Sequence, residues 1–96
     1  MRWFVLSYDL VDDSLACRPP LRDEHLARAG AARDRGELVL AGALGDPPGQ
    51  ALLVFRAADP SVAEGFARSD PYVMNGLFTR WRVEPWAVVI RHRPGE

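Results

Sequence analysis

Three segments of this chain are apolar at consecutive positions rather than at alternate ones. They are Trp3 to Leu6, Leu38 to Ala41 and Leu52 to Phe55. Aromatic, β-branched and aliphatic residues in such short runs predict strands. An antiparallel strand with one face in water should alternate apolar and polar residues, so these runs predict a sheet that is covered on both faces.

Turn and capping residues set the expected boundaries of the other elements. Pro19 and Pro20 suit the first turn of a helix that stops at Gly36. The turn residues Gly-Asp-Pro-Pro-Gly at 45–49 predict a hairpin. Asp59-Pro60 predicts an N-cap followed by the first residue of a second helix.

The predicted order is strand, helix, strand, strand, helix, strand. The expected ranges are strands at 2–9, 37–44, 50–56 and 79–91, and helices at 19–35 and 60–68. Pro85 predicts a bulge or an edge position for the last strand, and the segment 69–72 predicts a short extra turn ending at Gly76. This is the split β-α-β order of ferredoxin-like α+β folds with an antiparallel sheet.

The length and the apolar pattern together predict a homodimer. Ninety-six residues predict one domain, residues 1–96, which alone buries only roughly 60–65% of its unfolded surface. Two helices cover one face of the sheet, so a second copy is expected to cover the other.

Composition argues against several classes of function. A net charge of −1 disfavours nucleic-acid binding, and no apolar run is long enough for a membrane span. The N-terminal apolar run ends at Ser7, too early for a signal peptide, so a cytoplasmic protein is expected. All 12 positive residues are arginine, which excludes lysine-based chemistry. No metal or other cofactor is expected, since Cys17 is the only cysteine and His92 lies between arginines.

The first helix carries a histidine on its apolar stripe. At 100° per residue His25 falls beside Ala29 and Ala32, whereas the charged residues are assigned to the opposite side: Asp23, Glu24, Arg28, Asp34 and Arg35. A lone histidine on such a face is most often a core residue with a satisfied hydrogen bond. A carboxylate partner would favour a catalytic role instead.

Asp70 is the expected partner of His25, because the first helix and the loop after the second helix lie side by side in this topology. The carboxylate would hold one imidazole tautomer and complete a general acid–base pair. The alternative is that Asp70 only caps the turn that begins at Pro71.

Other polar residues are weaker candidates for substrate contact. Arg22 would bind a carboxylate or phenolate, or form a salt bridge to Asp9 or Asp70. Ser69 lacks a base of its own for nucleophilic attack, and Tyr72 and Trp86 suit either packing or the wall of a pocket.

Four motifs resemble the YCII-related (YciI-like) family over roughly residues 3–90. They are Arg22-x-x-His25-Leu26, Gly36-x-Leu38-x-x-Ala41-Gly42-Ala43-Leu44, Ser69-Asp70-Pro71-Tyr72 and Val83-Glu84-Pro85-Trp86. The resemblance implies a dimeric α+β barrel with an active site containing His25 and Asp70. One characterised branch is a dehydrochlorinase acting on a chlorinated hydroxyhydroquinone. The proline-rich segment 46–49 and Ala43, where a proline is common, depart from the family and affect the expected pocket shape.

Two functions remain open at the level of sequence. The first is a cofactor-free enzyme, of lyase (dehydrochlorinase) or isomerase type, that moves a proton on a small aromatic or carbonyl compound. Its expected site residues are His25 and Asp70 for catalysis, and for substrate contact Arg22, Gly42, Ser69, Tyr72 and Trp86. The second is a non-catalytic ligand-binding or accessory module whose His–Asp pair is structural. We expect His25→Ala to cost little stability, as it would if His25 faced a solvent-connected pocket.

Overall fold

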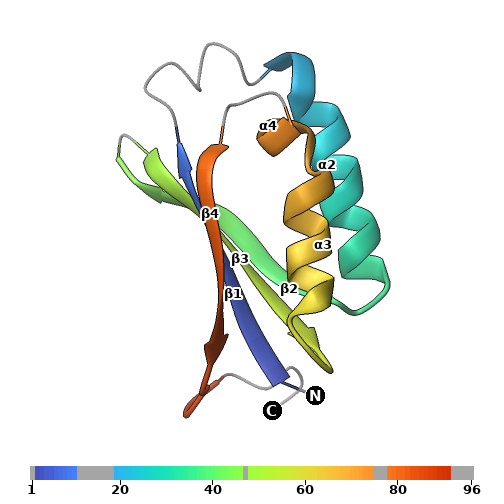
Figure 1. The fold of residues 1–96 in the computed structure, drawn as a ribbon, viewed down its shortest axis with the longest axis vertical. Coiled ribbons are helices and arrows are strands. Elements are labelled where there is room, and N and C mark those ends of the chain that lie inside the picture. The colour runs from blue at the N-terminus through green and yellow to red at the C-terminus, as the bar shows by residue number, and fades with distance from the viewer. Residues whose placement is uncertain (1, 11–18, 47, 75–77, 92–96) are drawn as a thin grey trace.

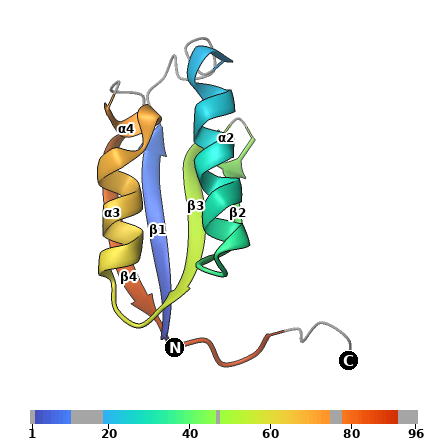
Figure 2. The same cartoon turned by 90° about the vertical axis from the view of Figure 1, so that its right-hand side faces the viewer.

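The computed structural model describes residues 2–10, 19–46, 48–74 and 78–91. Its strands are β1 (Arg2–Leu10), β2 (Leu38–Gly45), β3 (Pro48–Ala57) and β4 (Phe78–Trp86), and its helices are α2 (Pro19–Asp34), α3 (Ser61–Ser69) and α4 (Pro71–Met74). The strands form one antiparallel sheet in the order β2-β3-β1-β4 (Figure 1). Figure 2 shows the three helices on one face of that sheet. The ferredoxin-like α+β fold predicted from the sequence is confirmed.

The end of α2 is set by Gly36. Its φ of 79° is a conformation that residues with a Cβ rarely adopt. The Gly36 N–H donates to Arg33 at 2.9 Å and the Glu37 N–H to Ala32 at 3.0 Å. This pair of bonds is a Schellman motif, which satisfies carbonyls that the helix end leaves open. The helix ends at Asp34, one residue before the predicted end, and Gly36 lies just after it as predicted.

The start of α3 differs from the prediction by one residue. Pro60, with φ −71° and ψ −9°, takes the N-cap position expected for Asp59. The Asp59 carboxylate instead accepts the Ser61 backbone N–H at 2.8 Å and the Ser61 hydroxyl. These two donors hold the pKa of Asp59 below its ordinary value. The helix start is thus stabilised by a turn that precedes it.

The last strand is shorter than predicted. β4 ends at Trp86, whereas the sequence pattern predicted a strand up to Arg91. Trp86 pairs with Trp3, so beyond that point β1 has almost no residues left to pair with. Pro85, which lacks an N–H, lies near this end of an edge strand, as predicted. Directly after this point the backbone turns, since the Val88 N–H donates to the Trp86 carbonyl at 3.1 Å. The predicted end of the extra turn at Gly76 lies outside the described residues.

The two faces of the sheet differ in their surroundings. The face under the helices carries the core, which comprises Phe4, Leu6, Tyr8, Ala32, Leu38, Leu53, Phe55, Ala63, Phe66 and Ala67. The other face carries Trp3, Val5, Leu52 and Val54, which alternate with core residues along β1 and β3. Leu40, Leu44 and Trp86 are 62%, 50% and 48% exposed. The chain therefore presents an apolar sheet face that its own helices do not cover.

Candidate active site

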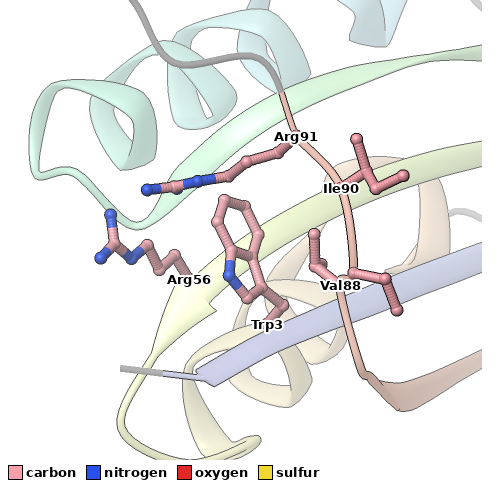
Figure 3. Close-up of a pocket in the computed structure, with 6 residues that line it drawn as sticks. Trp3, Arg56, Val88, Ile90 and Arg91 are labelled. Atoms are coloured by element: carbon pink, nitrogen blue, oxygen red, sulfur yellow. The ribbon is translucent and has the colours of Figure 1, made fainter.

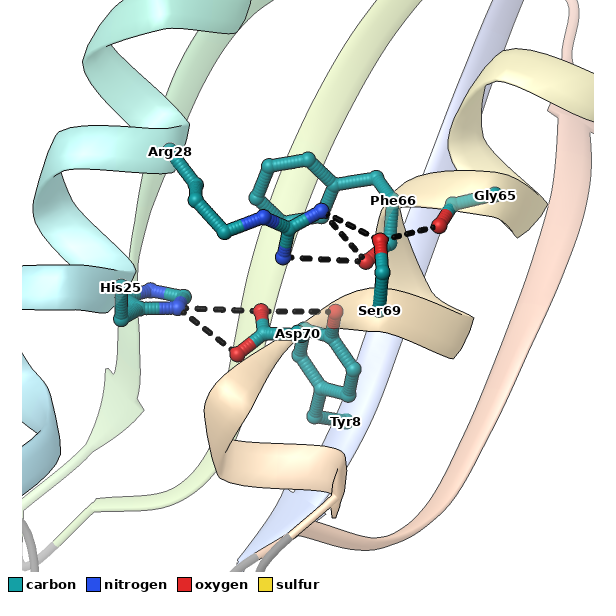
Figure 4. A network of polar contacts seen from close by, with 7 residues as sticks. All are labelled: Tyr8, His25, Arg28, Gly65, Phe66, Ser69 and Asp70. Atoms are coloured by element: carbon teal, nitrogen blue, oxygen red, sulfur yellow. Dashed lines mark hydrogen bonds and ion pairs between the residues drawn. The ribbon is translucent and has the colours of Figure 1, made fainter.

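The predicted proximity of His25 and Asp70 is present in the structure (Figure 4). His25 Nδ1 lies 2.9 Å from Oδ2 and 3.1 Å from Oδ1 of Asp70. A carboxylate can only accept hydrogen bonds, so Nδ1 must carry the proton. The Asp70 side chain is fully buried, and that of His25 is 14% exposed. The pair thus consists of a carboxylate that is inaccessible to solvent and an imidazole at the edge of the core.

Pro71 explains why Asp70 turns toward β1 and α2. A residue before proline is disfavoured in the helical region, and Asp70 is extended, with φ −69° and ψ 128°. α3 therefore ends at Ser69, and the chain starts again as α4. The Asp70 backbone carbonyl accepts the Met74 N–H at 3.0 Å. The dipeptide Asp70-Pro71 thus breaks one helix, begins the next and places a carboxylate between them.

Tyr8 is a third member of the site that sequence reasoning did not identify. It lies on β1, on the same face as Phe4 and Leu6, and its hydroxyl donates to Asp70 Oδ2 at 3.1 Å. A tyrosine at a core position of a strand normally needs a partner for its hydroxyl, which is the signal that could have revealed it. Burial, and then the negative charge of Asp70, raise the Tyr8 pKa well above its ordinary value of 10.0. Tyr8 is therefore a neutral donor to the carboxylate.

Alkaline pH is expected to destabilise the protein through Tyr8. The folded-state pKa of Tyr8 is raised, so its contribution is complete below about pH 10 and is lost as the pH rises above it. The unfolding free energy should fall by up to about 1.4 kcal/mol per pH unit for this one proton. Urea unfolding between pH 8 and 11.5 measures the slope, and Tyr8→Phe should flatten it. Parallel curves for the two proteins would contradict this assignment.

Arg28 lies next to the pair, although the helical-wheel prediction placed it on the opposite side of the helix. That prediction was wrong, because a spacing of three residues leaves Arg28 only about 60° from His25. Its guanidinium donates to the Ser69 hydroxyl at 2.6 Å and to the Phe66 carbonyl at 3.4 Å. It also lies over the Phe66 ring, 4.7 Å from the centroid. Arg28 thus binds the end of α3 immediately before Asp70.

Three predicted contact residues lie near the pair along the chain. Arg22 is exposed one turn before His25 on α2, and within the described part of the chain it forms no ion pair with Asp9 or Asp70. The Ser69 hydroxyl accepts from Arg28 and donates to the Gly65 carbonyl at 2.8 Å. Its contacts are therefore those of a structural hydroxyl. Tyr72 lies in α4, and its side chain is outside the described residues.

The structure does not bring Gly42 and Trp86 to the pair. Gly42 pairs with Leu52 on β3, which in turn pairs with Ser7, on the sheet face opposite Tyr8. Trp86 pairs with Trp3, five residues from Tyr8 and so about 16 Å along β1. Both residues belong to the uncovered sheet face.

Two surface hollows lined by described residues do not have His25 in their walls. One of about 470 Å³ lies where residues 88–91 pass Trp3, with Arg56 and Arg91 beside the indole (Figure 3). Another of about 340 Å³ separates α2 from β2, next to Leu26 and Leu40. The segments 11–18 and 75–77, which follow β1 and α4 in the chain, are outside the described residues. The described part of the site is thus the polar network itself.

Within the described ranges, no three His, Cys, Asp or Glu side chains gather as metal ligands would. None of the helices described there is both long enough and apolar enough to cross a bilayer.

The fold and the hydrogen bonds among Tyr8, His25 and Asp70 define an α+β protein with a polar network at the edge of its core. The family model of the YCII-related domain matches residues 1–87, and the chain belongs to this family. No curated protein matches the sequence.

Solved structures share the fold. The 5-chloro-2-hydroxyhydroquinone dehydrochlorinase TftG from Burkholderia phenoliruptrix, in complex with 2,5-dihydroxybenzoquinone, is 22% identical, with a TM-score of 0.72 over 88% of this chain and 92% of its own. A provisionally assigned antibiotic biosynthesis monooxygenase from Deinococcus radiodurans is 15% identical, with a TM-score of 0.57 over 97% of both chains. Rv0793 from Mycobacterium tuberculosis is 16% identical, with a TM-score of 0.53 over 95% of this chain and 97% of its own. At these identities the likeness is one of fold.

Proposed function

We propose that this protein is a cofactor-independent enzyme that moves a proton on a small molecule, with His25 as general base and Asp70 as its orienting carboxylate. The observation that carries the proposal is the contact of 2.9 Å between His25 Nδ1 and a fully buried Asp70. With Nδ1 protonated, Nε2 is the basic nitrogen of the ring. A carboxylate that holds the imidazole in one tautomer also stabilises the imidazolium once Nε2 has taken a proton.

Each member of the network has a defined part in this chemistry. Tyr8 donates to Asp70 and keeps one oxygen of the carboxylate in place. His25 takes a proton from carbon or oxygen of the substrate. In an elimination, the electron pair of the bond to the abstracted hydrogen is used to form a new π bond, and the leaving group departs with the electron pair of its bond to carbon. In an isomerisation, His25 returns the proton to another atom.

A hydroxylated aromatic or quinone is the substrate class that we infer. TftG, which shares the fold, is a dehydrochlorinase and was solved with 2,5-dihydroxybenzoquinone. Such compounds are acidic, and deprotonation gives a phenolate. Arg22, exposed one turn before His25, supplies a cation on that side of the helix for an anionic oxygen. Mass spectrometry of small molecules that co-purify with the protein would identify the compound itself.

The experiment is an anaerobic assay with a chlorinated hydroxyhydroquinone, because hydroquinones oxidise in air. Chloride release and the quinone spectrum are recorded with the parent and with His25→Asn. Asparagine can still donate to Asp70 but has no basic nitrogen. The parent should exceed the variant by about 10²–10⁴-fold, the usual contribution of a general base. Equal rates for the two proteins would refute the assignment of His25.

A non-catalytic ligand-binding or accessory module is the second candidate. The limited exposure of His25, 14%, favours a structural polar pair. This candidate predicts no turnover of any hydroxylated quinone. It also predicts that His25→Asn binds 2,5-dihydroxybenzoquinone as the parent does, which absorbance titration would measure.

We further propose that the protein acts as a homodimer through the uncovered sheet face. The exposed apolar side chains of Leu40, Leu44 and Trp86 support this arrangement. A stable interface should bury more than about 1,000 Å² in total. We also propose that residues 1–96 form one domain and that the protein is cytoplasmic. Nucleic acids and membranes are not proposed as partners.

A charge on the uncovered sheet face is expected to weaken the dimer. Leu40→Asp places a carboxylate where the partner would pack, and because Leu40 is 62% exposed, the fold of the subunit should tolerate it. Light scattering at micromolar concentration should report a dimer for the parent and mostly monomer for the variant. Met74→Asp, at a 71% exposed position on the helix side, is the matched control and should remain dimeric. A monomeric parent would contradict the proposal.

A further inference from the structure

We propose that Arg28 is the positioning residue of this site, because its guanidinium fastens the end of α3 to α2 and so fixes Asp70 against His25. The inference deepens the proposed function and rests on it for its catalytic consequence. The geometry itself is independent of any reaction.

The contacts of Arg28 are those of a helix cap supplied by another helix. The last carbonyls of α3 have no partner within the helix, and Arg28 donates to one of them, that of Phe66. A cation at this end also interacts favourably with the helix dipole. The guanidinium lies over the Phe66 ring, which also contacts the core residue Phe55 and lies edge-on to His25. The flat side chain is therefore held on two sides.

Ser69 completes the link between Arg28 and the backbone before Asp70. Its hydroxyl accepts from Arg28 at 2.6 Å and donates to the Gly65 carbonyl at 2.8 Å. The chain from Arg28 to Ser69 to Gly65 ties the last turn of α3 together (Figure 4). Asp70 is the next residue, so its Cα position follows from that of Ser69.

His25 and Arg28 contact two adjacent residues at the end of α3. They are three residues apart on α2, so they lie on the same side of the helix, and they bind Asp70 and Ser69 respectively. The backbone of α2 lies closer to β2 and to α4 than it does to α3. Long side chains therefore form the connection between α2 and the end of α3. Without Arg28, this connection between α2 and the end of α3 would be lost.

The charge of Arg28 also reaches the buried pair. Burial and Asp70 raise the pKa of Tyr8, and the positive charge of Arg28 opposes this rise. Arg28 thus lies within electrostatic reach of the network that Tyr8 forms with Asp70.

The test reads the tautomer of His25 by the ¹⁵N chemical shifts of its imidazole in ligand-free protein above pH 8. The parent should show one tautomer, with Nδ1 protonated. Arg28→Met keeps an unbranched side chain but removes the donors and the charge, and should move both shifts at least halfway toward those of an unstructured histidine peptide. Arg33→Met is the matched control, since Arg33 is exposed on the same helix and pairs only with Asp34 among described residues. Its spectrum should equal that of the parent.

Arg28→Lys separates geometry from charge and serves if Arg28→Met does not fold. Lysine keeps the charge, but its ammonium group is not planar and cannot donate to both the Phe66 carbonyl and the Ser69 hydroxyl. We therefore expect ¹⁵N shifts of His25 between those of the parent and those of Arg28→Met. Parent-like spectra for both variants, or for Arg28→Lys where only it folds, would overturn the proposal. The measurement needs no substrate. Loss of turnover in Asp70→Asn with unchanged spectra in the Arg28 variants would support the proposed function and refute the positioning role.

Discussion

Asp70→Asn is expected to lower the rate of proton transfer by about 10²–10⁴-fold while leaving the fold intact. The amide has nearly the shape of the carboxylate and can still accept the Tyr8 hydroxyl. Its NH₂ group would then face His25 Nδ1, which must become an acceptor. The proton moves to Nε2, and the ring loses its base on the side from which substrate would approach. The amide also cannot stabilise an imidazolium.

The control for Asp70→Asn is its effect on stability, measured by thermal unfolding. Replacement of a buried charge by a neutral isostere beside Tyr8 and His25 should change the unfolding free energy by only about 1–2 kcal/mol. Binding of 2,5-dihydroxybenzoquinone should persist, because Asp70 is fully buried. A variant that keeps parental turnover would show that Asp70 has no part in the chemistry.

His25→Ala is expected to cost about 1–3 kcal/mol in the free energy of unfolding. Asp70 is fully buried and would keep the Tyr8 hydroxyl, but it would lose the donor at 2.9 Å. This differs from the small cost expected from the sequence. The reason is that His25 is only 14% exposed, so it is a substantial part of what covers the carboxylate. For a chain of this size the melting temperature should fall by roughly 4–8 °C per kcal/mol.

His25→Asn is the matched variant that separates stability from catalysis. Its amide N–H can replace Nδ1 as the donor to Asp70, so most of the lost stability should return. Turnover should stay as low as in His25→Ala, because neither variant has a basic nitrogen. Parental turnover in His25→Asn would leave only the structural role of the pair. Equal melting temperatures of His25→Ala and the parent would mean that water replaces the imidazole without cost.

The order of elements could be predicted from the sequence because it depends on local signals, and the pairing of His25 with Asp70 followed from the topology that this order implies. Strand runs, the glycine at the end of α2 and the proline after Asp70 act within a few residues. His25 stood out since it interrupts an apolar stripe at helical spacing. Whether the chain forms one domain, and whether the pair is catalytic, remain predictions.

The tertiary structure alone decided what depends on distant partners. β4 ends at Trp86, which pairs with Trp3 near the start of β1, and the Val88 N–H then donates to the Trp86 carbonyl at 3.1 Å. Tyr8 joins Asp70 from 62 residues away, since the sheet brings the end of β1 under the break between α3 and α4. Helical spacing places Arg28 only about 60° from His25, but only the tertiary structure supplied the carbonyl, hydroxyl and ring of α3 that it contacts. Local sequence sets which residues share a face, but the groups that such a face meets are set by the packing of other elements.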